Sequence, residues 1–141
     1  MLNPSFSSEK ITQLCEQYGT QFLITDQLFT NFDENLTACE LPTLDYASLA
    51  TLTLTSGSSG LPKAVAHSIK NHLANAEGVC ELLDFKQGDS WLLSLPLFHV
   101  SGQGIVWRWL LQGATLYVNE DKADFFELLS QVSHASLVPT Q

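Results

Sequence analysis

The chain has 141 residues, of which 45% are hydrophobic and 15% are charged, as is typical of one globular domain with a hydrophobic core. Its formal net charge is −9, from 6 Lys and Arg residues against 15 Asp and Glu residues. This charge, without a basic run or a basic amphipathic helix, argues against nucleic acids and anionic membranes as partners. Lys10 is the only basic residue among the first 50, so we expect any anion site to lie beyond residue 50.

Cysteine usage and the terminal sequence predict a cytoplasmic protein. Cys15, Cys39 and Cys80 are odd in number and far apart, without a C-x-x-C motif, which is typical of free thiols in a reducing compartment. The N-terminus lacks a basic segment followed by an apolar core, so we expect no signal peptide. The charge-free run 90–107 approaches the length of a membrane span, but Pro96 and several polar residues interrupt it, and we expect none.

The first 45 residues are predicted to form a leading α/β segment. Ser7 or Ser8 is a candidate helix cap, and Gly19 a candidate helix end. The apolar residues on one face of this helix are Ile11, Leu14, Cys15 and Tyr18. "QFLIT" at 21–25 is a candidate strand, and polar residues 30–45 are expected to form a loop.

The remaining chain alternates between strand and helix patterns. "SLATLTLT" and "KAVAHS" alternate as strands, and residues 69–83 predict a helix. The residues expected on the inward face of that helix are Leu73, Ala76, Cys80 and Leu83. The elements expected after it are a strand "WLLSLP", a helix 102–112 stopped by Gly113, a strand "ATLYV", a helix 123–132 and an apolar strand "HASLVP". We therefore expect an α/β fold with a mixed, largely parallel sheet flanked by helices.

The stretch "TSGSSGLPK", residues 55–63, joins the first two of these strands. A flexible linker would need two domains to separate, whereas a plain tight turn accounts for the glycines and serines. A turn leaves unexplained the density of hydroxyls beside Lys63, which together with freed backbone N–H groups suit an anion. The motif is not G-x-x-x-x-G-K-[ST], because Leu61 and Pro62 separate Gly60 from Lys63, and no G-x-S-x-G elbow occurs.

Two motifs in the same order resemble those of the adenylate-forming acyl- and aryl-CoA ligase superfamily. "LTLTSGSSGLPKAVAHS" is similar to its hydroxyl- and glycine-rich loop ending in G-x-P-K, and "SLPLFHVSG" to its aromatic-His segment. Ser59 departs from the usual threonine but keeps the hydroxyl. The stretch from Asp89 to Val118 is most similar to o-succinylbenzoate-CoA ligases of menaquinone biosynthesis.

This resemblance implies a two-step ligase. ATP and a carboxylate give an acyl-adenylate and pyrophosphate, and coenzyme A then displaces AMP to form a thioester. It implies that Lys63 and His99 are catalytic, with Lys63 on the phosphates and His99 in the acyl pocket. The other implied phosphate-binding residues are Thr55, Ser56, Gly57, Ser58, Ser59 and Gly60. Without the resemblance, His99 in such apolar surroundings is more typical of a structural residue.

The resemblance covers nearly the whole chain but only an inner part of the family's large N-terminal domain. We therefore expect residues 1–141 to be one domain and a fragment, comprising a leading segment 1–45, a strand–loop–strand 46–68 and α/β units 69–141. Mg²⁺ is expected as a cofactor with most of its ligands elsewhere, as are the adenine and CoA sites. We expect the isolated chain to be inactive, and the oligomeric state is left open.

Arg108 is the only arginine in the chain and lies within an apolar predicted helix. Ser101, Gly104 and Arg108 share one helical face, and helical side chains lean toward the N-terminus. Arg108 is therefore expected to reach over Gly104 and to bind the second, non-reacting carboxylate of o-succinylbenzoate. The structural alternative is that Arg108 extends to solvent.

Other aromatic and histidine residues receive no catalytic role. We interpret His67, Trp91, Trp107 and Trp109 as structural, and assign nothing to His72 and His134. Two alternative functions remain open. The chain could serve another acyl- or aryl-CoA ligase, or it could be a non-catalytic phosphate-binding domain.

Overall fold

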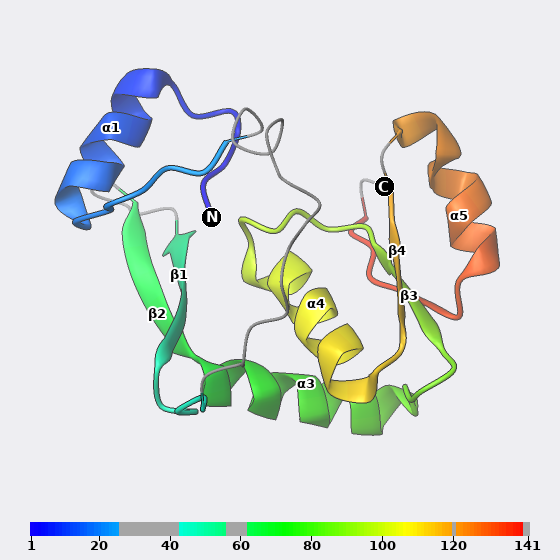
Figure 1. Ribbon diagram of the computed structural model, residues 1–141. Helices are drawn as coiled ribbons and strands as arrows, with labels where there is room; N and C mark the ends of the chain where they lie inside the picture. Colours follow the sequence, from blue (N-terminus) through cyan, green and yellow to red (C-terminus); the bar gives the residue numbers. More distant parts are fainter. Residues whose placement is uncertain (26–42, 56–61, 120, 140–141) are drawn as a thin grey trace, which may run out of the picture. The chain divides into compact units, whose positions relative to one another are not determined.

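The computed structural model describes residues 1–25, 43–55, 62–119 and 121–139. The chain divides into two compact units, Leu2–Leu44 and Asp45–Gln141, the second including Met1. The described part of the first unit contains one helix, α1 (Ser8–Gln17) (Figure 1). Ser7 caps α1 by accepting a hydrogen bond from the backbone N–H of Lys10, so the predicted cap is confirmed.

The strand predicted at 21–25 is wrong. These residues have no regular secondary structure, and the side chains of Phe22 and Ile24 are 82% and 68% exposed. The apolar pattern indicated a strand, but strand structure needs a paired neighbour, and none of the described strands pairs with this segment. Most of the loop predicted at 30–45 lies outside the described residues.

The second unit opens with an antiparallel pair of strands, β1 (Leu49–Thr55) and β2 (Lys63–Ser68). Thr55 pairs with Lys63 at the end of the ladder where residues 56–62 connect the strands. Both strands were predicted from their alternating side chains. Thr51 and Thr53 lie on the same face of β1, because side chains two residues apart in a strand point the same way.

Helix α3 (Ile69–Leu83) follows β2 without a loop. Its start is fixed by a capping box between Ser68 and Asn71, and its end by Asp84 in a left-handed conformation at φ 52°. The helix bounds match the prediction, and so does its inward face at Ala76 and Cys80, but not at Leu83. His72, Ala76 and Cys80 are buried, whereas Leu83 is 46% exposed because the chain turns at Asp84.

A three-stranded parallel sheet completes the fold. It consists of β4 (Thr115–Val118), β3 (Ser90–Leu93) and β5 (His134–Ala135) in that order. The connections are α4 (Val100–Gln112) and η1 (Lys122–Asp124) followed by α5 (Phe125–Gln131). Figure 1 shows α4 and α5 on opposite sides of this sheet. The sheets are thus mixed in type and flanked by helices, which confirms the predicted α/β class.

Two of these elements differ in length from the prediction. Helix α4 begins two residues before the predicted start at Gly102, and it ends before Gly113 as expected. Strand β5 is only two residues long, whereas "HASLVP" predicted a longer strand. Leu137 and Val138 are largely exposed and do not continue the pairing with β3.

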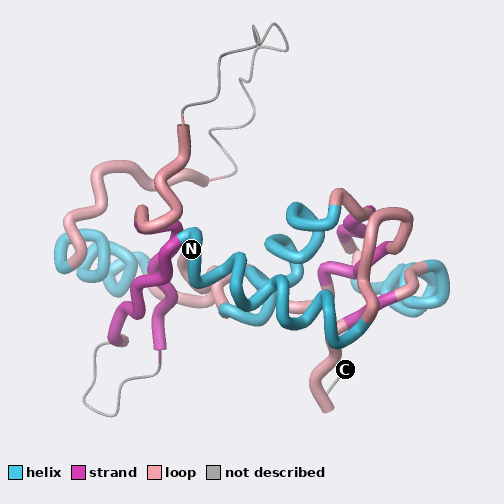
Figure 2. Tube along the Cα trace, turned by 90° about the horizontal axis from the view of Figure 1, so that it is seen from below, coloured by secondary structure: helices cyan, strands magenta, loops and turns pink. Residues whose placement is uncertain are grey.

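The core of the second unit lies where α3 and α4 meet the parallel sheet. Its buried residues are Cys80, Phe85, Trp91 and Ile105. Phe85 rather than Leu83 fills the space beyond Cys80, and its ring meets that of Trp91 edge to face at 4.9 Å between centroids. Figure 2 shows the β1–β2 pair and the parallel sheet at opposite ends of α3. Helices α3 and α4 therefore join the two strand groups.

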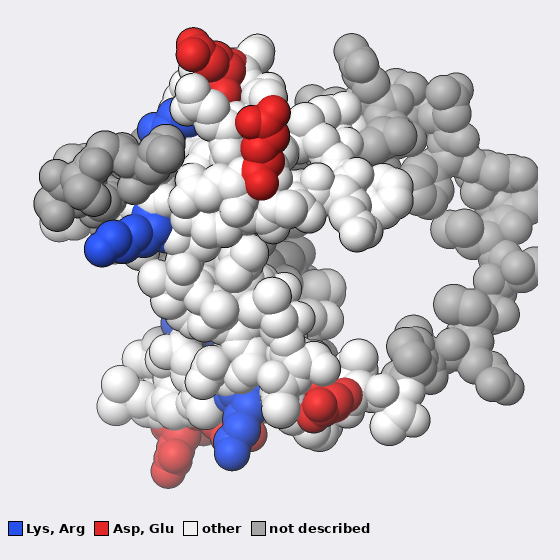
Figure 3. All heavy atoms as spheres, turned by 90° about the vertical axis from the view of Figure 1, so that its left-hand side faces the viewer, with Lys and Arg blue, Asp and Glu red and all other residues white. Residues whose placement is uncertain are grey.

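Among the described residues, no helix combines the length and the apolar character needed to cross a bilayer. Figure 3 shows Lys and Arg side chains singly among mostly uncharged residues on the face that it draws. This distribution agrees with the absence of a basic run in the sequence.

Candidate active site

The two ends of the predicted phosphate-binding loop lie side by side. Thr55 and Lys63 are exposed, and the Thr55 hydroxyl donates a hydrogen bond to the backbone carbonyl of Lys63 at 3.2 Å. This contact joins the two strands at the end of the ladder, where Lys63 is the first residue of β2. The predicted residues Ser56, Gly57, Ser58, Ser59 and Gly60 lie outside the described residues.

His99 is the N-cap of α4 and is exposed to solvent. Its side chain makes no capping hydrogen bond, and its ring centroid lies 4.5 Å from that of Phe98. Ser101 is also exposed, in the first turn of the helix. His99 therefore presents its imidazole at the positive end of the α4 dipole, a suitable place for an anionic group.

The start of α4 packs tightly against the segment that precedes it. A Cβ added to Gly102 would overlap the carbonyl oxygen of Pro96 and would lie 2.6 Å from that of Leu95. Only glycine permits this approach. The backbone N–H of His99 also donates to the Pro96 carbonyl at 3.1 Å, which ties the start of α4 to the segment before it.

Arg108 reaches back along α4 over Gly104, as its position on the helix predicts. A Cβ built on Gly104 would lie 3.1 Å from a terminal nitrogen of the Arg108 guanidinium. The guanidinium carbon lies 4.9 Å from the ring centroid of Trp91, a cation–π contact. Burial lowers the pKa of Arg108 from its ordinary value because it penalises the charged form. The Nε atom is buried and has no hydrogen-bond partner among the described residues.

A buried polar network between β1, α3 and α4 escaped the sequence analysis. The side-chain oxygen of Gln103, a residue only 2% exposed, accepts hydrogen bonds from the hydroxyls of Thr51 at 3.2 Å and Thr53 at 3.3 Å. Thr51 also bonds Nε2 of His72 at 2.8 Å, and the His72 ring stacks on Trp107. The threonines on one face of β1 were a signal that this face meets polar partners.

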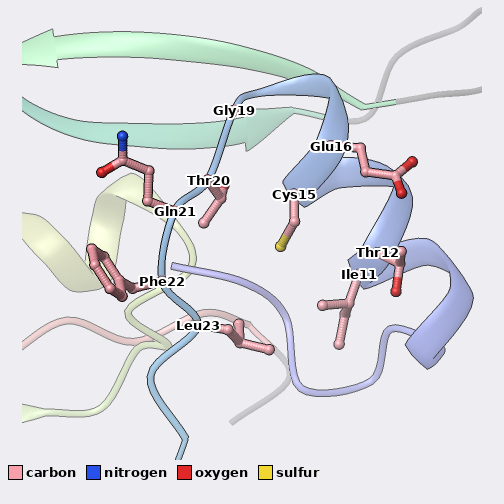
Figure 4. Close-up of a pocket in the computed structure, with 9 residues that line it drawn as sticks. All are labelled: Ile11, Thr12, Cys15, Glu16, Gly19, Thr20, Gln21, Phe22 and Leu23. Atoms are coloured by element: carbon pink, nitrogen blue, oxygen red, sulfur yellow. The ribbon is translucent and has the colours of Figure 1, made fainter.

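The first unit contains a hollow that includes none of the predicted site residues. Its volume is about 530 Å³, and it lies between α1 and residues 19–23 (Figure 4). Ile11 and Cys15 from α1 and Leu23 from the following segment point toward a common space. The hollow is mainly apolar. Cys15 and Glu16 both line it, but the Glu16 carboxylate points away from the Cys15 sulfur (Figure 4).

Comparison with known proteins places these features in a family. The family model described as AMP-binding enzyme matches residues 29–141, which include the hairpin, His99 and Arg108. The chain belongs to the AMP-binding enzyme family. The two motifs that resemble adenylate-forming ligases thus lie within a family match over most of the chain.

Among the relatives of this AMP-binding chain are two bacterial enzymes named 2-succinylbenzoate–CoA ligase. The Haemophilus influenzae enzyme is 53% identical over 140 residues, which are 99% of this chain and 30% of the relative. The Escherichia coli K12 enzyme is 44% identical over 148 residues, covering 99% of this chain and 32% of the relative. The chain therefore spans about a third of the length of these relatives.

Solved structures of related AMP-binding enzymes have the same fold. An arginine-to-lysine variant of E. coli MenE with bound OSB-AMS has a TM-score of 0.84 and 40% identity, covering 99% of this chain and 33% of that chain. The o-succinylbenzoate CoA synthetase of Bacillus subtilis in complex with ATP and magnesium ion has a TM-score of 0.75 and 25% identity, covering 99% and 43%.

Proposed function

We propose that this chain is the phosphate-loop and acyl-pocket segment of an o-succinylbenzoate-CoA ligase of menaquinone biosynthesis, located in the cytoplasm. The complete ligase activates o-succinylbenzoate with ATP to give the acyl-adenylate and pyrophosphate, and coenzyme A then displaces AMP to give the thioester. The observation that carries the proposal is the 53% identity to the H. influenzae 2-succinylbenzoate–CoA ligase over 99% of the chain.

The hairpin between β1 and β2 is assigned to the phosphates of ATP. Lys63 and the Thr55 hydroxyl stand at its two ends, and the hydroxyls and backbone N–H groups of residues 56–60 complete the proposed phosphate contacts. In-line attack of a carboxylate on the α-phosphorus requires little covalent chemistry from the protein. The hairpin therefore acts by positioning the phosphates and by neutralising the charge of the departing pyrophosphate.

The start of α4 is assigned to the acyl substrate. His99 and Ser101 present exposed polar side chains beside the helix N-terminus, where His99 orients the reacting carboxylate. One turn further along, Gly104 has no side chain, so the Arg108 guanidinium packs directly against the helix backbone there. Arg108 is assigned to the second carboxylate, directly or through water, because its buried Nε lacks a partner among the described residues and a carboxylate would supply one.

Mg²⁺ accompanies ATP in this proposal, with most of its ligands expected outside this chain. The described residues contain no group of three His, Cys, Asp or Glu side chains that could hold a metal ion. We assign no step to the metal here. Most of its ligands, like the adenine and CoA sites, are proposed to come from other parts of the ligase.

The proposal is tested with the complete gene product that carries this chain. We expect pyrophosphate release that requires both ATP and o-succinylbenzoate, followed by thioester formation when CoA is added. Benzoate and a medium-chain fatty acid serve as control substrates. Faster turnover of either control would favour a different acyl- or aryl-CoA ligase. Phosphate binding without turnover of any carboxylate would favour the non-catalytic domain.

A further inference from the structure

Gln103 contacts both segments to which the proposed reaction is assigned. Its backbone N–H donates to the carbonyl of His99 at 3.2 Å, and its side-chain Nε2 donates to the carbonyl of Leu97 at 3.0 Å. The same side chain accepts from Thr51 and Thr53 on β1 through Oε1. One amide thus holds the segment before α4 and the strand that leads to Thr55.

The side-chain amide of Gln103 is buried, so its hydrogen bonds strongly restrict the relative positions of β1 and α4. Gln103, Thr53 and His72 are 2%, 5% and 4% exposed, so water does not compete freely for their polar atoms. A buried polar group that loses its partner keeps the full cost of desolvation. The arrangement with all bonds formed is therefore strongly preferred over displaced ones, and the spacing between β1 and α4 is fixed.

The direction of the hydrogen bonds in the network can be assigned. The single hydroxyl hydrogen of Thr51 points to Gln103 Oε1, so the 2.8 Å contact with His72 requires the ring to donate from Nε2. Stacking on Trp107, with centroids 4.9 Å apart and planes 6° from parallel, holds the ring in that orientation. The chain of donors runs from α3 through β1 to α4.

We propose that Gln103 is a positioning residue of the ligase. Its side chain sets the distance between the β1–β2 hairpin, which carries Thr55 and Lys63, and the segment that carries His99. The inference rests on the proposed function. The ATP phosphates and the substrate carboxylate are held by different segments, and a displacement of about 1 Å between reacting groups costs on the order of 100-fold in rate.

The first test is the kinetics of Gln103→Leu in the complete ligase. Each segment keeps its own binding groups, so we expect KM for ATP and for o-succinylbenzoate to change less than about threefold. The adenylation rate per folded molecule should fall by about tenfold or more. The matched control, Gln112→Leu at the other end of the same helix, should leave that rate unchanged. An unchanged adenylation rate in folded Gln103→Leu would overturn the proposal.

Variants of Thr53 separate hydrogen bonding from packing. Thr53→Val keeps the shape and removes the hydroxyl, and it should slow adenylation. Thr53→Ser keeps the hydroxyl and removes a methyl group, and it should retain more of the wild-type rate. The effects of Thr53→Val and Gln103→Leu should be less than multiplicative when combined, because they break the same contact. The reverse order of the two Thr53 variants would show that packing alone matters.

Amide hydrogen exchange tests whether Gln103 holds β1 and residues 97–99 together, and this measurement does not depend on which substrate the ligase uses. In Gln103→Leu, amides of both β1 and residues 97–99 should exchange faster, while those of α5 should keep their wild-type rates. Faster exchange in neither segment would overturn the positioning role. Failure of wild-type turnover with o-succinylbenzoate would instead count against the proposed function alone.

Discussion

Lys63 is the residue whose proposed role depends most on charge. It begins β2 opposite Thr55 and is exposed, so its ammonium is free to approach phosphate without reorganising the core. In the complete ligase we expect Lys63→Ala to slow adenylation far more than thioester formation, because pyrophosphate is present only in the first step. A charge-assisted hydrogen bond contributes about 1.5–3 kcal/mol, roughly a 10- to 100-fold change in rate. Single-turnover rates of the two half-reactions measure this, and equal slowing of both would contradict a phosphate role.

Arg108 is the single residue whose substitution tests the proposed recognition of the second carboxylate. Its guanidinium is partly desolvated over Trp91 and Gly104, which makes an added carboxylate a favourable partner. Arg108→Gln should raise KM for o-succinylbenzoate about tenfold or more and leave KM for ATP nearly unchanged. An analogue without the ring carboxylate should be a poor substrate of the wild type and should lose that disadvantage in the variant. A variant that loses stability but keeps its KM would support the purely structural alternative.

At the scale of the element, we expect alanine substitutions at two helical glycines to change the free energy of unfolding in opposite directions. A methyl group on Gly102 would overlap the Pro96 carbonyl, so Gly102→Ala should displace the start of α4 and lower the free energy of unfolding by more than about 1 kcal/mol. Gly78 in α3 has nothing within 4 Å of an added Cβ. Gly78→Ala should therefore raise the free energy of unfolding by about 0.5–1 kcal/mol, because alanine favours a helix over glycine. Denaturant unfolding of both variants measures the difference, and equal effects would contradict the packing at Pro96.

The network around His72 predicts a pH dependence. Burial lowers the pKa of His72 from 6.5, and neighbouring His67 lowers it further. The unfolded chain then takes up the proton at a higher pH than the folded chain, so the free energy of unfolding should fall as the pH drops below about 6.5. His72→Gln should reduce that fall between about pH 7.5 and pH 5.5, as measured by denaturant unfolding. The same fall in the variant would assign the pH dependence to other groups.

At the scale of the whole molecule, the coverage of the relatives bears on activity. The chain spans 30% and 32% of two curated ligases, and its described residues contain no metal site. We expect the isolated 141-residue chain to release no pyrophosphate with ATP and o-succinylbenzoate under conditions in which the complete ligase does. Turnover by the isolated chain would contradict this expectation, and the mass of the natural gene product tests whether the chain is a fragment.

The sequence by itself determined the elements whose pattern is local. The alternation in "LTLT" and "KAVAHS", the cap at Ser7 and the helix 69–83 depend on neighbours within a few residues, so they were predicted correctly. The two family motifs could also be recognised, because each lies in one continuous stretch. The same local reasoning failed at 21–25, where an apolar run lacks a strand to pair with among the described residues.

Only the tertiary structure decided which distant side chains meet. Gln103 has no distinctive sequence signal, and His72 showed no partner, yet 31 residues separate them and Thr51 joins both. The burial of Phe85 in place of Leu83 likewise depends on the turn at Asp84. These contacts arise when β1, α3 and α4 pack together, and a linear pattern does not encode the distance between separate elements. The two family motifs could therefore be recognised from the sequence, whereas the network proposed to hold them in register required the fold.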